Sequence, residues 1–473
     1  MSSWLTIFLG ILLIAYSCAP VPPHELAEVM DSCGCEQVGE EALKSGNFLE
    51  EEAPPEVWWK KIQDPLLIQL IERALVLSPT LQRAEASLKA AEHVAKQKQA
   101  VLFPELWFDA EDDWQHLSKS GFFRAYAPTI PPVVNDITVG LSFSYEFDFW
   151  GKNRDIFEAS LGQAAALAAE RIQAELILTT SIAYTYTELQ LLLLSKEILE
   201  RRKSNELAIQ DFRLKRQQNA LDTAITQLGS QANTLEVQTT LTELDLDIEN
   251  QIHKLKALIG VGQDAQLVIK PKFITPLQVS LPKNLSLDLI SRRPDLIAQK
   301  ARIESASKEI GAAKKDFYPN IDLMSFIGLE SVKVSKLFQG SSFSGSITPA
   351  IHLPIFTAGR LRAHLKEKVA NFNEAVYAYN QLILQTAQEV ADRLTDLFFL
   401  EKEIENAKAL LQIARKQADL TQRRRENALD NLMDVKLAEN VVLKQEIELV
   451  AFEYGKQLEA ILLIRALGGG YYD

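Results

Sequence analysis

The chain has 473 residues, of which 47% are hydrophobic and 24% are charged, with only 20 glycines and 18 prolines. This composition allows a sizeable core and favours a largely helical protein. A net charge of −13 argues against proteins that bind nucleic acid through a basic face, so we expect no nucleic-acid partner.

The N-terminal residues predict export and a lipid anchor. An apolar run from Trp4 to Ala15 is too short to cross a membrane and fits the core of a signal peptide, 1–17. Cys18 resembles the acylated cysteine of a bacterial lipoprotein, although Ala15 stands where leucine is usual and no Lys or Arg precedes the run. We expect covalent lipid, such as palmitate, on Cys18; the alternative is an ordinary signal peptide cut nearby.

Residues 18–60 are acidic and lack a clear hydrophobic period, so we expect an extended, lipidated N-terminal arm. Within it, Cys33 and Cys35 form a Cys-x-Cys pair with no further metal ligands nearby. We interpret this pair as solvated rather than metal-binding.

A first structural unit is expected over residues 61–259. It begins with a helix over about 66–102, interrupted near Ser78-Pro79. Two strands follow, at about 105–116 and 137–149, separated by an exposed loop with Gly121 and three prolines. A helix over about 153–217 and another over about 222–259 complete the unit as a long hairpin.

The strand at 137–149 alternates for longer than most soluble strands. Odd positions from Ile137 to Phe149 are apolar, and even positions are polar or acidic. Its length matches the roughly 9–11 residues with which a tilted strand crosses a bilayer, and it ends in the aromatics Phe149-Trp150. A membrane strand is therefore predicted; a half-buried strand of a soluble sandwich is the alternative.

The same pattern recurs after a proline-bearing linker, 260–285. Residues 286–467 predict a second repeat with strands at about 320–330 and 346–356 and another long helical hairpin, followed by a tail, 468–473. The repeat junctions correspond: Pro104 to Pro319, and Gly151 to Gly359. Both hairpins turn at Asn-Ala-Leu-Asp, residues 219–222 and 427–430. We interpret this as an internal tandem repeat.

Four strands cannot close a membrane barrel, because an open sheet edge would leave backbone N–H and C=O groups unpaired in hydrocarbon. The chain must therefore share a barrel with identical copies. Two copies would give eight strands and three would give twelve. The predicted fold class is mainly α with β: a membrane barrel shared between copies and continued by the long helices as a tube across an aqueous compartment. A soluble coiled-coil protein capped by β-hairpins is the alternative.

Four segments together resemble a known family. They are YEFDFWGKNR (145–154), RRPDLIAQKARIESASKEIGAAKKDFYPNI (292–321), LPIFTAGRLRA (353–363) and AQEVADRL (387–394). The chain is similar along nearly all of its mature length to the TolC-type outer-membrane factors of bacterial tripartite efflux and type I secretion, and most to their NodT/OprM-like lipoprotein branch.

The resemblance implies a homotrimer in the outer membrane of a Gram-negative-type cell, anchored by lipid. Its four strands per chain would form a trimeric outer-membrane β-barrel of twelve strands, continued by a long α-helical periplasmic barrel. It implies a passive exit duct without catalysis. The partners would be a periplasmic membrane-fusion adaptor and a proton-driven inner-membrane pump of the resistance–nodulation–division (RND) type. The alternatives are a duct of type I protein secretion, or a non-channel periplasmic coiled-coil structural or adaptor protein.

The hairpin turns depart from the family, which usually has glycine where this chain has Ala220 and Ala428, so the turn geometry could differ. An acidic position that narrows the tunnel in related proteins aligns with Leu437. We predict a tunnel constriction near these turns; its candidates are Leu429, Met433, Leu437 and Asp434, with Asp430 as a further charge. Packing between helices is an equal alternative for the three apolar residues.

The polar face of the strand at 137–149 carries two candidate lumen charges, Glu146 and Asp148. They would favour cations by a field effect, and a merely solvated face is the alternative. The chain carries none of the common hydrolase, metalloprotease or P-loop motifs, and its six histidines have no metal-ligand spacing. We therefore predict no enzyme, no metal and no cofactor apart from the lipid on Cys18.

Overall fold

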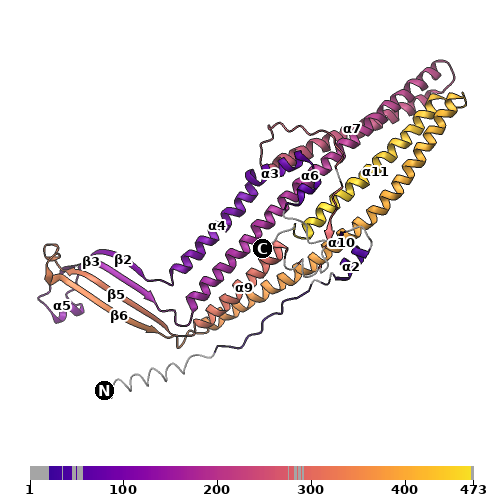
Figure 1. Cartoon of the computed structure of the whole chain (residues 1–473). Coiled ribbons are helices and arrows are strands. Elements are labelled where there is room, and N and C mark those ends of the chain that lie inside the picture. The colour runs from indigo at the N-terminus through magenta and orange to yellow at the C-terminus, as the bar shows by residue number, and fades with distance from the viewer. Residues whose placement is uncertain are drawn as a thin grey trace. The chain divides into compact units, whose positions relative to one another are not determined.

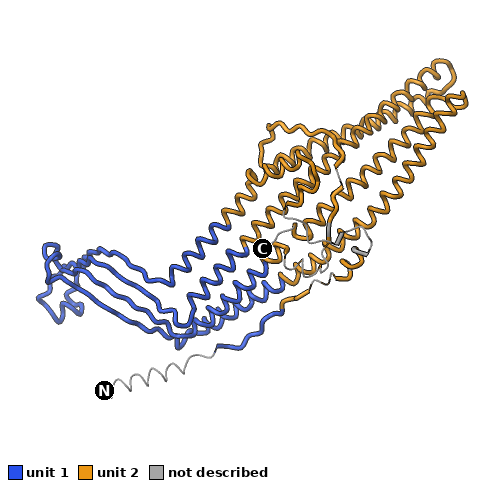
Figure 2. The backbone as a smooth tube through the Cα atoms, in the orientation of Figure 1, with its two compact units in different colours: residues 1–28, 88–166, 299–378 blue, residues 29–87, 167–298, 379–473 orange. Residues whose placement is uncertain are grey.

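A computed structural model describes residues 21–32, 34, 36–44, 49–50, 57–274, 276–281, 285, 289 and 292–469. The predicted signal peptide, all three cysteines and residues 470–473 of the tail lie outside these ranges. The chain forms two compact units (Figure 2): unit 1 comprises residues 1–28, 88–166 and 299–378, and unit 2 comprises residues 29–87, 167–298 and 379–473. None of the described helices is both long and apolar enough to cross a bilayer.

The strands of unit 1 form one antiparallel sheet of order β2-β3-β5-β6 (Figure 1). Their bounds are Glu105–His116 for β2, Val133–Glu146 for β3, Asn320–Ser331 for β5 and Phe343–His352 for β6. Within this sheet β2 and β6 are the edge strands, each paired on one side only. The edges therefore present unpaired backbone groups.

The predicted bounds of β2 and β5 agree with the structure, whereas those of β3 and β6 are displaced. The strand predicted at 137–149 begins at Val133 and ends at Glu146, and the one predicted at 346–356 spans 343–352. Val133 and Val134 pair with the end of β2, and Pro354 follows β6 without an N–H for a ladder. The expected exposed loop also contains a short helix, α5, Phe122–Tyr126.

The long helices occur where the sequence predicts them. In the first half, α3 (Pro65–Leu77) and α4 (Pro79–Ala100) precede the sheet, and α6 (Lys152–Gln218) and α7 (Ala224–Ile259) follow β3. In the second half, α9 (Pro294–Lys315) precedes β5, and α10 (Arg360–Glu426) and α11 (Leu432–Ala466) follow β6. Both α6 and α10 have 67 residues, and the order helix–strand–strand–helix–helix occurs twice (Figure 1).

The start of α3 shows how local sequence sets these boundaries. The Asp64 carboxylate accepts the N–H groups of Leu66 at 2.9 Å and Leu67 at 3.3 Å, and Pro65 occupies the first helical position. These are the preferred residues for an N-cap and a first turn. Ser78 before Pro79 is extended and separates α3 from α4, because a residue preceding proline avoids the helical region.

The arm expected over residues 18–60 contains more structure than predicted. Its described part includes the helix α2 (Glu36–Lys44), the strand β1 (Leu49–Glu50) and the 3-10 helix η1 (Trp58–Ile62). β1 pairs in parallel with β4, Ser280–Leu281, and Trp58 and Ile62 are each 1% exposed. Tertiary burial, which has no local signature in an acidic stretch, explains the difference. Residues 21–32 have no regular secondary structure.

The core of unit 2 joins α6 and α11 to the linker predicted at 260–285. Buried apolar side chains from both helices meet there; they are Leu194, Ile198, Leu443, Val450 and Tyr454. The Tyr454 hydroxyl donates to the carbonyl of Lys272 at 2.8 Å and accepts the N–H of Ile274 at 3.3 Å. These two hydrogen bonds of the Tyr454 side chain attach the linker to α11.

Candidate functional site

Strand register divides the sheet of unit 1 into one acidic and one apolar face. Residues directly opposite each other in an antiparallel pair share a face. The acidic face collects carboxylates from three strands: Glu105, Asp109, Glu111, Asp113, Asp136, Glu146, Asp322 and Glu330. The four strands contain no Lys or Arg.

Two cross-strand pairs on the acidic face join like charges directly. Asp113 lies opposite Asp136, and Glu146 lies opposite Asp322. Directly opposed like charges destabilise a sheet. Lys152 lies 3.1 Å from Glu146 and compensates one of the two pairs, whereas Asp113 and Asp136 have no Lys or Arg beside them on the four strands. An aqueous, high-dielectric surround lowers the cost of the Asp113–Asp136 pair, so the register indicates that this face contacts water.

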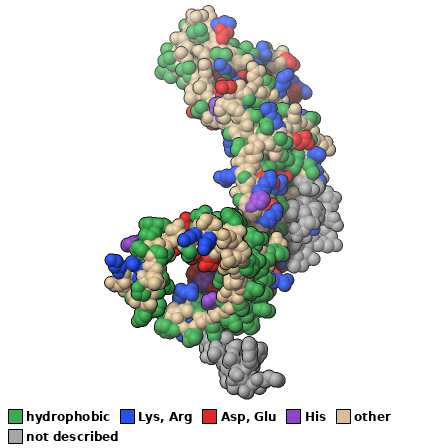
Figure 3. Space-filling view, turned by 90° about the vertical axis from the view of Figure 1, so that its left-hand side faces the viewer, with side chains coloured by type: hydrophobic (Ala, Val, Ile, Leu, Met, Phe, Trp, Pro, Cys, Tyr) green, Lys and Arg blue, Asp and Glu red, His purple; other side chains and the backbone are tan. Residues whose placement is uncertain are grey.

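The opposite face is mostly apolar. Its members on the two inner strands are Ile137, Val139, Leu141, Phe143, Tyr145, Ile321, Leu323, Ser325, Ile327 and Leu329. Asp112 of β2, opposite Ile137, is the one carboxylate that the register places on this face. Viewed from the loop end of unit 1, hydrophobic side chains gather around the outer rim of a hollow (Figure 3).

A glycine pair at the centre of the acidic face holds an aromatic ring. Gly140 lies opposite Gly328, and a Cβ on either residue would come within 2.7 Å of the Phe326 ring. Glycine is therefore required at both positions, because the ring lies over them. The arrangement keeps Phe326 flat against the backbone of the acidic face.

The predicted lumen charges Glu146 and Asp148 lie where the sheet meets α6. Glu146 ends β3 and forms an ion pair with Lys152 at 3.1 Å. Asp148 follows the strand, and its carboxylate accepts the N–H groups of Asn153 at 3.1 Å and Arg154 at 2.8 Å. Asp148 therefore caps the N-terminus of α6, a position that favours a negative charge.

The acidic face itself was only partly predicted from the sequence. Periodicity placed the even positions of β3 on a polar face, but it did not connect them with Asp109, Glu111 and Asp113 on β2. That connection requires the register of pairing.

The predicted repeat junctions lie at the strand–helix boundaries. Gly151 and Gly359 have φ of 76° and 87°, the left-handed region that favours glycine. The Trp150 indole N–H donates to the carbonyl of Pro319 at 2.8 Å, and its ring stacks on Tyr318 at 5.2 Å. Pro104 immediately precedes β2, as Pro319 precedes β5.

The two hairpin turns have nearly the same backbone. Ala220 and Ala428 adopt φ of 55° and 60°, so each alanine takes the left-handed conformation that a glycine would supply. The N–H of Leu221 donates to the carbonyl of Arg216 at 2.8 Å, and the N–H of Leu429 donates to that of Arg424 at 2.9 Å. Both alanines thus adopt the backbone conformation in which glycine is favoured.

The turns differ in their ion pairs. Arg424 binds Asp430 at two points, with distances of 2.7 and 2.9 Å, and this guanidinium holds the pKa of Asp430 below its usual value. Arg216 approaches Asp222 only to 3.6 Å. The pKa of Asp222 is lowered first by the hydroxyl of Thr226 and by the backbone N–H of Thr223. Arg216 instead donates from Nη2 to the carbonyl of Leu221 at 3.0 Å, so the arginine binds a backbone carbonyl in the first turn and a carboxylate in the second.

The predicted constriction residues lie at this end of unit 2. Leu429 is 67% exposed in the turn, Leu437 is 42% exposed on α11, and Met433 is half-buried. Packing between helices of one protomer does not account for Leu429 and Leu437. Asp434 forms a capping box with Asn431 at the start of α11, so its carboxylate has a structural partner.

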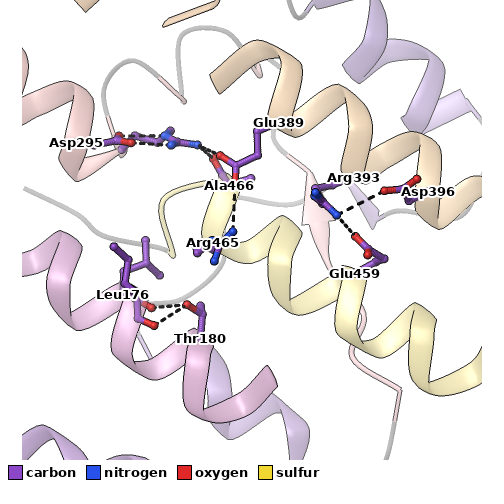
Figure 4. Close-up of polar contacts among 11 residues, drawn as sticks. Leu176, Thr180, Asp295, Glu389, Arg393, Asp396, Glu459, Arg465 and Ala466 are labelled. Carbon is purple, nitrogen blue, oxygen red and sulfur yellow. Dashed lines mark hydrogen bonds and ion pairs between the residues drawn. The ribbon is translucent and has the colours of Figure 1, made fainter. Parts of the chain in front are cut away.

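A buried arginine ties three elements of unit 2 together (Figure 4). The Arg293 side chain, 9% exposed, contacts Asp295 at 2.6 Å, Glu389 of α10 at 3.1 Å and the carbonyl of Ala466 in α11 at 2.7 Å. Burial opposes its charge, but the hydrogen bonds and charges of Asp295 and Glu389 raise its pKa overall. This structural role of the RRPD segment was not predicted.

Comparison with known proteins identifies the family. The model named "Outer membrane efflux protein" matches residues 70–261 and 285–469. The chain is 29% identical over 428 residues to "Multidrug resistance outer membrane protein MdtP" of Shigella flexneri, covering 88% of this chain and 87% of that protein. It is 29% identical over 474 residues to "Multidrug resistance outer membrane protein MdtQ" of Escherichia coli O157:H7, covering 98% and 97%.

Solved structures agree with this result. The outer membrane protein VceC of Vibrio cholerae is 32% identical, with a TM-score of 0.79 over 89% of this chain and all of that one. The CmeC outer membrane channel of Campylobacter jejuni, at 20% identity, shares the fold with a TM-score of 0.83 over 96% and 94%. These matches confirm the resemblance to TolC-type factors. The chain therefore belongs to the outer membrane efflux protein family.

Proposed function

We propose that three copies of this chain close a twelve-strand barrel in the outer membrane, with β6 of each copy paired to β2 of the next. The sheet's two unpaired edges carry this proposal. Open edges in hydrocarbon would cost several kcal/mol for each unsatisfied backbone group, on the order of the cost known for buried polar groups. Pairing edge to edge removes that cost, and three copies would supply twelve strands.

In this assembly the apolar face contacts lipid and the acidic face lines the aqueous lumen, as is usual for membrane barrels. The Asp113–Asp136 pair supports this orientation, since only a watery surface screens it well. The long helices then lie in the periplasm, and the channel conducts its substrates passively.

The family and the names of the relatives support a role in efflux of drugs, with a periplasmic adaptor and an RND-type pump as partners. The pump would select the cargo and this chain would conduct it. We also propose that the mature chain begins at an acylated Cys18, which adds a second attachment to the membrane.

Cysteine cross-linking across the proposed β6–β2 contact tests the assembly. In a background with Cys33→Ser and Cys35→Ser, Ala110→Cys on β2 is combined in turn with Gly345→Cys or Ile347→Cys on β6. Within one protomer three strand spacings, about 14 Å, separate β2 from β6, which is too far for a disulfide. Cross-linked species can therefore form only between copies.

We expect oxidised dimers and trimers in outer-membrane fractions from at least one paired variant, and monomers from Ala110→Cys alone. The second expected result is a mass of three chains for the protein extracted in detergent. A monomeric mass together with no cross-linking at any pair would overturn the trimer. Unchanged accumulation of several dyes and drugs in a host lacking the gene would overturn the assignment to drug efflux.

A further inference from the structure

A cavity of about 290 Å³ in unit 2 is lined by the linker, α10 and α11. Much of its wall is apolar, and these side chains come from the linker and from α10: Phe273, Ile274, Pro276, Leu277 and Ile404. An apolar cavity of about 150 Å³ in another protein holds one benzene molecule. The cavity of unit 2 therefore has room for a ligand of roughly two fused rings.

Hydrogen bonds from α11 fix the linker side of this cavity. The Tyr454 hydroxyl accepts the N–H of Ile274 at 3.3 Å, and Oε1 of Gln457 accepts the N–H of Leu277 at 2.7 Å. Tyr454 is 4% exposed and Gln457 is 5% exposed, so both bonds are shielded from water. The wall is formed before a ligand arrives, which lowers the ordering cost of binding.

The side-chain amide of Gln457, which lines the cavity, has a donor left over. Within the described part of the chain, Nε2 of Gln457 is buried and makes no hydrogen bond. The amide cannot turn over, because the N–H of Leu277 requires the carbonyl oxygen where it is. A buried donor without an acceptor lowers stability. A ligand that places an acceptor atom at Nε2 would remove this cost.

The charged side chains that line the cavity compensate one another. Lys456 pairs with Glu401, and Lys408 pairs with Glu453 at 3.6 Å. All four line the cavity, so together they give it no net charge. A charged ligand would bring a charge without a free partner into a largely apolar space, which is costly. The cavity therefore favours a neutral ligand.

We propose that this cavity binds a neutral aromatic molecule of about two fused rings, one atom of which accepts a hydrogen bond from Nε2 of Gln457. The rings of Phe273 and Tyr454 provide aromatic contacts for such a molecule. The site lies within unit 2 of a single chain. It is therefore independent of the proposed trimer and of transport.

Quinoline and naphthalene test the role of the donor, because their shapes are nearly the same and only quinoline carries an acceptor. Binding to the full chain in detergent is followed by NMR at the Ile404 methyl group, with the free probe concentration measured by dialysis. In Gln457→Met the dissociation constant of quinoline, divided by that of naphthalene, should rise about tenfold over wild type, the effect of one lost hydrogen bond. Using this ratio cancels the different solvation of the two probes in water.

Two control variants separate the donor from the rest of the wall. Phe273→Ala removes a ring that is 66% exposed and should weaken both probes by a similar factor, so that the ratio stays within about twofold of wild type. Gln417→Met replaces an exposed glutamine of α10 outside the cavity and should change neither dissociation constant.

The wild-type chain provides a test without any substitution. Quinoline should shift the Nε2 proton resonances of Gln457 downfield, and naphthalene should not, because only an acceptor deshields these protons. An unchanged ratio in Gln457→Met would overturn the proposal. The absence of a quinoline-specific shift at Gln457, or of any response of Ile404 to either probe, would overturn it as well.

Discussion

Arg424 and Asp430 form a two-point ion pair across the second hairpin turn, with Nε–Oδ2 and Nη2–Oδ1 distances of 2.7 and 2.9 Å. The matching pair in the first turn, Arg216 and Asp222, is separated by 3.6 Å. In the first turn Arg216 donates to the carbonyl of Leu221 at 3.0 Å, so two turns of nearly identical backbone differ in the group that the arginine binds.

Arg424→Gln should loosen the second turn. We expect amide exchange at Ala428 and Leu429 to rise about two- to fivefold, the effect of an exposed ion pair. Arg423→Gln is the control, because Arg423 pairs instead with Asp419 within its own helix at 2.9 Å and should leave these amides unchanged.

The same pair predicts a pH dependence. The hydrogen bond from Arg424 holds the pKa of Asp430 below its usual value, so the pair contributes fully above the usual aspartate pKa and is lost as the pH falls through the lowered pKa. We therefore expect the amide exchange rates of Ala428 and Leu429 in Arg424→Gln, divided by those in wild type, to approach a ratio of one in strong acid. A ratio that stays constant with pH would contradict this role.

Ala220→Gly and Ala428→Gly should each stabilise the protein. A left-handed conformation costs alanine about 1 kcal/mol or more relative to glycine, and this exceeds the entropy lost with glycine in the unfolded chain. Ala438→Gly, inside α11, should instead destabilise by about 1 kcal/mol. Denaturant unfolding of the three variants measures the difference, and the same sign for all three would disprove the argument.

Neutralising the acidic face should reduce selectivity for cations. Asp109→Asn, Glu111→Gln and Asp113→Asn together remove three charges per chain from that face. We expect the cation-to-anion permeability ratio to fall at least about twofold in bilayer recordings at 0.1 M salt. The difference should shrink at 1 M salt, where screening acts over about 3 Å.

Asp112→Asn is the matched control, since Asp112 lies on the same strand but on the apolar face. The permeability ratio of this variant should equal that of wild type. Equal effects of the triple variant and of Asp112→Asn would show that the two faces are not divided between lumen and lipid.

Arg293→Met should destabilise unit 2 by about 3–5 kcal/mol, because it leaves two carboxylates and a helix-end carbonyl without their buried partner. Arg465→Met removes a more exposed guanidinium, 36% accessible and 3.5 Å from Glu389, and should cost at most about 1 kcal/mol. Denaturant titrations of the two variants compare them directly. Equal losses of unfolding free energy in the two variants would mean that burial of the guanidinium does not determine the loss of stability.

Sequence reasoning succeeded where structure follows from local pattern. The helix lengths, the bounds of β2 and β5 and both hairpin turns agree with prediction, since periodicity, Pro79 and Gly260 mark them locally. Prediction from the sequence failed where the structure depends on contacts between segments that are far apart in the chain. The early start of β3, the acidic face and the burial of Trp58 depend on pairing or packing across the chain.

The N–H of Ala27 in the N-terminal arm donates to Oδ1 of Asn373 in α10 at 2.8 Å, and this attachment limits how far a lipid on Cys18 could reach. Nine residues separate the two positions, and fully extended chain covers about 30 Å over that interval. An acyl group on Cys18 would therefore keep the bilayer surface within this distance of Asn373.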